Sequence, residues 1–365
     1  KFTQLFLLSC EMQETNPRSI FSWRNMLLPI GITLLATAYL IYLLSKVDYA
    51  QVATITLTRH LVSILLLAVG TVFIRDAAYV YRMWELNDRK LSIAKCIEII
   101  FLWEFGSSVT PASFGGVSMA FLILYKEGIK PGKATSILML CSYLDNIAFV
   151  IVFGTLYLIL GHHMFDLSAT CGNLDQLSTV KAFRSVGEYV WIGFLAVAMS
   201  GMILGFSLFI RPQYAVSFLN KIAQIKFINR WEKQIHHISV DIMHTSIEFQ
   251  NKGTGFVIKL LIGTTISWCA RYALANVLIY GFASGLFDNL DVFARQYVHR
   301  VIVIIPATPG GSGIAELSFM ALNCEFIKDG LAPIVTLIWR GFNFYFYIIV
   351  GIVILPKWLA RVGKI

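Results

Sequence analysis

Residues 305–316 read IPATPGGSGIAE, and residues 110–116 read TPASFGG. Each stretch interrupts a long apolar segment, residues 292–326 in the first case and 96–125 in the second. Proline removes a backbone N–H donor and adjacent glycines destabilise a helix interior, so each segment is predicted to form two helices around a break. At membrane depth such a break must be buried in protein or face a wet cavity. We interpret both segments as re-entrant helix hairpins; kinked spans or pairs of short crossings are the alternatives.

Six further segments are apolar enough to cross a membrane as single helices. The hydrocarbon core of a bilayer is about 30 Å thick and needs roughly 20 apolar helical residues. The six predicted crossings are residues 27–44, 61–81, 134–160, 189–210, 260–283 and 331–355. We therefore expect an all-α polytopic membrane protein with six full crossings and two re-entrant hairpins.

The composition agrees with a membrane protein. Hydrophobic residues make up 57% of the 365 residues and charged residues only 14%, where soluble domains average about 25% charged. The mean hydropathy is +0.70. This composition argues against a disordered chain, a basic nucleic-acid-binding protein and an ordinary cytosolic enzyme.

The net charge of +9 is explained by topology. With the N-terminus inside, 19 of the 30 lysines and arginines fall in predicted cytoplasmic segments and six outside. Cytoplasmic loops of membrane proteins carry such an excess of positive charge. We expect a multi-pass protein of the bacterial cytoplasmic (inner) membrane with both termini in the cytoplasm, and no nucleic-acid partner.

The two halves of the chain repeat one pattern. Arg75 and Arg271 are 196 residues apart, Pro111 and Pro309 are 198 apart, and Asp145 and Arg340 are 195 apart. Because the predicted topology turns the second half upside down, the pattern is an inverted repeat, which is typical of transporters. The predicted divisions are an N-terminal cytoplasmic or interfacial segment (1–26), a first membrane half (27–210), an amphipathic cytoplasmic linker helix (211–253) and a second membrane half (254–365).

The breaks and the buried charges indicate what could bind. A helix that starts after a Gly-Gly pair presents free N–H groups and a positive dipole end, which suit phosphate or carboxylate. An arginine at bilayer depth is costly unless it is paired or hydrated, so a functional role is the default. The alternative for each arginine is an ion pair that locks helices together, with Asp76, Asp145, Glu104 or Glu316 as partner. Glu316 is also placed to cap the second half-helix.

The candidate substrate-binding residues follow from these two features. They are Arg75, Arg271, Arg340, Thr308, Pro309, Gly310, Gly311, Glu316, Gly115, Gly116 and Asp145. We predict no catalytic residues, no metal site and no cofactor, because the chain shows none of the usual hydrolase, phosphate-loop or zinc motifs.

Residues 305–316, followed by Leu-Ile-Trp-Arg-Gly-Phe at 337–342, resemble the transmembrane (flippase) domain of bacterial lysylphosphatidylglycerol synthases. The first hairpin, from Thr110 through Gly116 to Lys126, fits the other motif of that family. The resemblance runs from about residue 28 to 359 and implies a stand-alone flippase domain without the soluble aminoacyl-transfer domain. It implies movement of an anionic or aminoacylated phospholipid and assigns function to Pro309, Gly310, Gly311, Glu316 and Arg340.

We therefore predict a lipid flippase that moves an anionic or aminoacylated phospholipid, or a lipid-linked precursor, between leaflets by alternating access. The protein is not expected to be an enzyme. A proton-coupled transporter of a small organic anion and a non-transporting membrane scaffold are the alternatives. The expected partners are the lipid substrate and the membrane, and homo-oligomerisation is left open.

Overall fold

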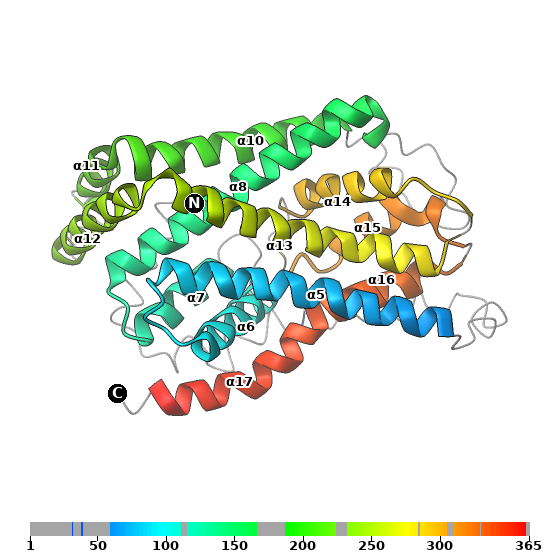
Figure 1. Cartoon of the computed structure of the whole chain (residues 1–365), viewed down its shortest axis with the longest axis horizontal. Coiled ribbons are helices and arrows are strands. Elements are labelled where there is room, and N and C mark those ends of the chain that lie inside the picture. Colours follow the sequence, from blue (N-terminus) through cyan, green and yellow to red (C-terminus); the bar gives the residue numbers. More distant parts are fainter. Residues whose placement is uncertain are drawn as a thin grey trace.

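A computed structural model shows a bundle of helices (Figure 1) and describes residues 59–110, 115–165, 187–223, 232–283, 285–304, 308, 310–328 and 330–362, with the single positions 31 and 38. The α-helices are α5 (Arg59–Leu86), α6 (Ile93–Val109), α7 (Gly115–Lys126), α8 (Pro131–Leu160), α10 (Gly187–Gly205), α11 (Pro212–Ala223), α12 (Glu232–Asn251), α13 (Gly253–Gly281), α14 (Asn289–Ile304), α15 (Ile314–Asn323), α16 (Ala332–Arg340) and α17 (Phe346–Val362). No strand occurs among these described residues. The fold class is therefore all-α, as predicted.

Four of the predicted crossings are helices long and apolar enough to span a membrane. They are α5, α8, α13 and the continuous helix Ala332–Val362, in which the π-helical turn Gly341–Tyr345 joins α16 to α17. The fifth predicted crossing, residues 189–210, forms the shorter apolar helix α10 and a π-helical turn at Phe206–Ile210. The sixth, residues 27–44, lies outside the described residues except for Gly31 and Ala38.

The outer surface of these helices is apolar. Large side chains are exposed along α5, α8, α10, α13 and α17, among them Phe73, Leu158, Ile203, Ile266 and Ile349. An apolar belt of this extent is not stable in water and marks contact with another apolar phase. Since the helices beneath it are long enough to span a bilayer, the belt is the lipid-facing surface.

The centre of the bundle is the antiparallel pair of α5 and α13, which lie side by side in Figure 1. Their contacts run in opposite directions along the two helices: Ile64 approaches Gly281 near the start of α5, and Tyr81 approaches Gly263 near its end. In between, the hydroxyl of Ser267 donates to the backbone oxygen of Arg75 at 3.0 Å. Small residues on α13 thus let the two backbones approach closely.

Each of the two predicted helix breaks occurs, and each lies between two helices that pack against each other. α6 ends at Val109 and α7 begins at Gly115; α14 ends at Ile304 and α15 begins at Ile314. In the first hairpin, a Cβ on Gly116 would lie 2.0 Å from Ser107 Oγ, and in the second a Cβ on Gly311 would lie 2.6 Å from Val303 Cγ1. Glycine at both positions allows the returning helix to pack against the outgoing one.

One end of the bundle is held by an ion-pair cluster that joins three segments. Asp88, in the loop after α5, accepts from Lys133 of α8 at 2.6 Å and also pairs with Lys252, which precedes α13. Although burial opposes ionisation, the hydrogen bonds and charges of these two lysines lower the pKa of Asp88 to about 2. The carboxylate is therefore charged at any physiological pH, and the three segments stay joined.

Residues 211–253, predicted as one amphipathic linker helix, contain two helices, α11 and α12, and α12 packs against α8 and α11. Its residues Ile242 and Phe249 are buried, while Val240 and Ile247 remain exposed. The contact with α8 depends on Gly132, because a Cβ there would lie 1.9 Å from Asp241 Cβ and 3.0 Å from Asp241 Cα. Because the backbone Cα of Asp241 is involved, a change of side-chain rotamer cannot relieve the clash.

Gly132→Ala should therefore destabilise the protein by about 1–3 kcal/mol, the usual cost of overpacking. Gly154→Ala on the same helix is the matched control, because a Cβ there meets nothing within 4 Å. Thermal unfolding in detergent micelles would measure both variants. Equal midpoints for the two variants would contradict the packing of α12 on α8.

Candidate functional site

A cavity of about 350 Å³ lies between the two hairpins and the long helices. Its lining comes from α6, α13, α14, the start of α15 with the loop before it, and the junction of α16 with the following π-helical turn. The charged lining residues are Glu104, Arg271, Arg300 and Arg340. The cavity thus brings four charged side chains together, among apolar and aromatic ones, in a bundle with an apolar exterior.

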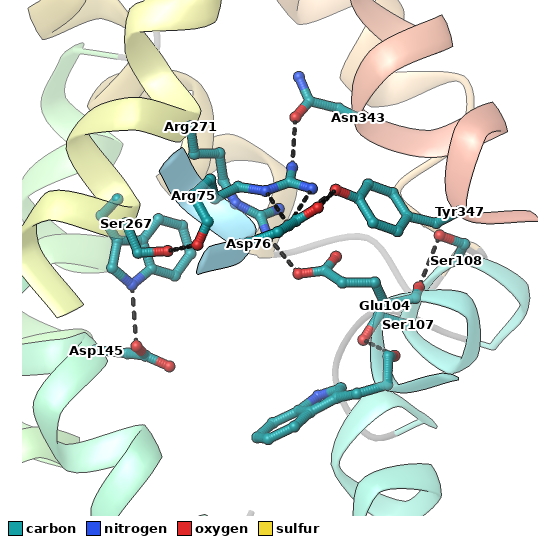
Figure 2. A network of polar contacts seen from close by, with 12 residues as sticks. Arg75, Asp76, Glu104, Ser107, Ser108, Asp145, Ser267, Arg271, Asn343 and Tyr347 are labelled. Carbon is teal, nitrogen blue, oxygen red and sulfur yellow. Dashed lines mark hydrogen bonds and ion pairs between the residues drawn. The ribbon is translucent and has the colours of Figure 1, made fainter. Parts of the chain in front are cut away.

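Arg271 and Glu104 form an ion pair across the cavity wall. Arg271 extends from the middle of α13 and donates through Nη2 to Glu104 Oε1 on α6 (Figure 2). The two side chains are 21% and 17% exposed, so they are not fully sealed off. The pair joins the first hairpin to the central helix of the second half and leaves Nε of Arg271 without a described hydrogen-bond partner.

Arg75, the counterpart of Arg271 in the repeat pattern, is fully buried and lies outside the cavity lining. Its guanidinium donates to Asp76 Oδ1 at 2.9 and 3.0 Å and to Asn343 Oδ1 at 3.1 Å (Figure 2). The hydroxyl of Tyr347 donates to the same Asp76 carboxylate, at 2.8 Å to Oδ2. This closed network fixes α5 against the π-helical turn and the start of α17.

Asp145 pairs with Arg82, the residue that follows the predicted crossing 61–81. Arg82 lies in the last turns of α5, is 5% exposed, and donates through Nη1 to Asp145 Oδ1 at 2.6 Å. The same oxygen accepts from the indole Nε1 of Trp268 at 3.0 Å. The apolar run of this crossing ends at Tyr81, whereas the helix continues to Leu86 and so includes Arg82.

The loop before α15 is held in an unusual backbone conformation. Gly310, Gly311 and Gly313 have φ values of 54°, 68° and 90°, in the left-handed region that side chains disfavour. A Cβ on Gly310 would also lie 2.2 Å from the ring of Phe344. The Gly-Gly pair is thus required by both backbone conformation and close packing.

Glu316 and Arg340 organise this loop together. Glu316 Oε2 accepts from the backbone N–H of Gly313 at 2.7 Å, which is the predicted capping interaction at the start of α15. Its Oε1 accepts from Arg340 Nε at 2.6 Å. Arg340 also donates to the carbonyl of Gly310 at 3.2 Å and to Ser312 Oγ at 3.3 Å. Both side chains are about 5% exposed.

The structure brings three of the predicted site residues into the cavity lining: Arg271, Arg340 and Gly310. Arg75, Asp145, Gly311 and Glu316 support residues that line it. Thr308 accepts from Gly311 N–H at 3.0 Å through its backbone, and its buried hydroxyl has no described hydrogen-bond partner. Gly115 begins α7, Gly116 packs on Ser107, and Pro309 lies outside the described residues.

Several lining residues were absent from the predicted set. They include Trp268, Gln296, His299, Arg300 and Asn343. A signal existed for Arg300: it is an arginine inside the apolar segment 292–326, and it lies 196 residues after Glu104, the same offset that separates Arg75 from Arg271. The others carry no charge that would stand out in a transmembrane sequence.

The fold and the cavity define a polytopic helical membrane protein with a charged central compartment. Residues 26–351 match the family described as the lysylphosphatidylglycerol synthase transmembrane region, and the chain belongs to this family. A relative from Archaeoglobus fulgidus, a UPF0104 membrane protein, is 21% identical over 272 residues, which cover 72% of this chain and 75% of the relative. The resemblance drawn from residues 305–316 and 337–342 is thereby confirmed.

Arg340→Met should destabilise the protein strongly, because it leaves the buried Glu316 carboxylate without its cation. Removing one partner of a buried ion pair typically costs about 3–5 kcal/mol. In the double variant Arg340→Met/Glu316→Gln the residual group is neutral, so part of the loss should be recovered. Unfolding in detergent would measure both, and an Arg340→Met variant as stable as the wild type would contradict the role of this pair.

Proposed function

We propose that this protein moves an anionic or aminoacylated phospholipid, or a lipid-linked anionic precursor, between the two leaflets of a bacterial cytoplasmic membrane. The headgroup occupies the central cavity while the acyl chains stay in the lipid. Alternating exposure of the cavity to the two sides carries the headgroup across. The protein acts as a transporter and not as an enzyme, with both termini in the cytoplasm.

The observation that carries this proposal is the cavity itself. Three arginines and one glutamate line about 350 Å³ inside a bundle whose outer surface is apolar. Charged side chains inside a membrane protein's apolar bundle cost free energy, and they are retained where a charged substrate passes. Family membership adds support, because the family is named for the membrane region of enzymes that make an aminoacylated phospholipid.

The proposed alternating access rests on an inverted repeat with re-entrant hairpins. The antiparallel α5 and α13 support such a repeat, as do the two hairpins. Gly116 packs on Ser107 in the first hairpin, and Gly311 packs on Val303 in the second. Gly311 lies 195 residues after Gly116, and Val303 lies 196 residues after Ser107. In transporters of this design, one repeat moves against the other around a fixed site. The substrate-binding set that we propose is Arg271, Arg340 and Gly310, supported by Glu316, Arg75 and Asp145.

The test is lipid translocation in proteoliposomes. Headgroup-labelled phosphatidylglycerol should move between leaflets in the presence of the protein faster than labelled phosphatidylcholine. Arg271→Ala alone would leave Glu104 unpaired, so the informative variant is Arg271→Ala/Glu104→Gln, which should remain folded and should lose the protein-dependent rate. Lys90→Gln, which removes an exposed charge in the loop after α5, is the control and should transport normally.

Normal transport by Arg271→Ala/Glu104→Gln would remove Arg271 from the site. Uptake of a small water-soluble anion without lipid movement would instead support the secondary-transporter alternative. A protein that moves neither class of substrate would support the scaffold alternative.

A further inference from the structure

Among the described residues, the cavity contains one more positive charge than nearby carboxylates neutralise. Arg271 is paired with Glu104 and Arg340 with Glu316. The third arginine, Arg300 of α14, has no carboxylate within ion-pair distance among the residues that the structure describes. Its Nε and Nη1 atoms are inaccessible to solvent and make no described hydrogen bond, although the hydroxyl of Tyr272 lies close to the guanidinium. Buried donors of a charged group are rarely left in this state, because each costs free energy.

Arg300 is nevertheless held in place. Its guanidinium carbon lies 3.7 Å from the ring centroid of Trp268 and 5.2 Å from that of Phe149. Trp268 is itself anchored, because its indole N–H donates to Asp145, which is held by Arg82. Stacking on an aromatic face stabilises a guanidinium without using its N–H donors. The cation is therefore held in the cavity lining without a described carboxylate to balance its charge.

The other anion site expected in this region is already filled. The N-terminus of α15 was predicted to bind phosphate, but the Glu316 carboxylate accepts the Gly313 N–H and neutralises Arg340 at the same point. An incoming anion would have to displace that carboxylate. At Arg300 it would displace no protein carboxylate, so binding there is favoured.

The repeat pattern makes the same point. Glu104 and Arg300 occupy positions 196 residues apart, on the outgoing helices of the two hairpins, and both line the cavity. The first hairpin presents a carboxylate there, which neutralises Arg271. The second presents a cation that no described carboxylate balances. The difference between Glu104 in the first hairpin and Arg300 in the second thus accounts for the excess of positive charge in the cavity.

We infer that Arg300 is the residue that binds the oxyanion of the transported group. The identification of that group as a phospholipid rests on the proposed function. A guanidinium donates two parallel hydrogen bonds to a phosphate oxygen pair, and such charge-assisted bonds are strong where water is excluded. The same chemistry would accept the phosphodiester of a lipid headgroup or the phosphate of a small soluble anion. Arg271 and Arg340 belong to the same binding site, where carboxylates already neutralise them, and Arg300 supplies the unbalanced charge that attracts the substrate.

Binding to purified protein in a neutral detergent tests this inference directly. Calorimetry would compare dihexanoyl phosphatidylglycerol, dihexanoyl phosphatidylcholine and glycerol phosphate as probes. Arg300→Gln should weaken binding of the anionic lipid about ten- to one-hundredfold. Arg300→Lys should weaken it less, because lysine keeps the positive charge and loses only the two parallel N–H donors of the guanidinium. Arg59→Gln, which removes an exposed charge at the start of α5, should bind as the wild type does.

Thermal unfolding separates a binding role from a structural one. Without lipid, Arg300→Gln should unfold at the wild-type temperature or above it, because it removes an unbalanced cation. Saturating anionic lipid should raise the midpoint of the wild type and not that of Arg300→Gln. A clearly lower midpoint for Arg300→Gln without lipid would overturn the inference, because it would show that the arginine holds the fold together.

The failure of this inference is distinguishable from failure of the proposed function. If Arg300→Gln binds and moves the anionic lipid as the wild type does, the inference is overturned and lipid transport stands. If the wild type binds glycerol phosphate through Arg300 and moves no lipid, the oxyanion site stands and the transported group is a small anion. If the wild type binds neither anionic probe, the oxyanion site is overturned.

Discussion

The structure depends on the cost of placing arginine away from water. Four arginines of the membrane core are each matched by a carboxylate: Arg75 by Asp76, Arg82 by Asp145, Arg271 by Glu104 and Arg340 by Glu316. Three of these pairs connect different helices. Because an unpaired charge in this environment costs several kcal/mol, each pair fixes the depth and rotation of the helices that carry it.

The same constraint shapes the cavity. Pairing between α13 and α6, and between α16 and α15, draws the two hairpins towards the central helices and leaves a cavity with charged lining residues where their ends meet. The glycines of the second break allow its backbone to turn there at positive φ. Arg300 has no carboxylate partner among the residues that the structure describes, and it lies in the cavity where an anionic substrate would supply the missing charge.

Much of the fold could be predicted from the sequence, because apolar length and Pro-Gly breaks are local signals. Four spans and both hairpin breaks were found in this way, and the motif around Pro309 and Arg340 identified the family. The partners of the charges could not be predicted, because pairing depends on how helices rotate and at what depth they meet. The pairing of Arg82 with Asp145 was missed for this reason, and Arg300 was left out of the predicted site although its charge and its spacing from Glu104 are visible in the sequence.

The most direct test of the central claim is an experimental structure of the protein in nanodiscs that contain phosphatidylglycerol. We predict a lipid whose phosphate lies in the cavity, in contact with the guanidinium of Arg300, and whose acyl chains pass between helices to the surrounding bilayer. A cavity without a headgroup, with ordered lipids only along the apolar outer belt, would contradict the account.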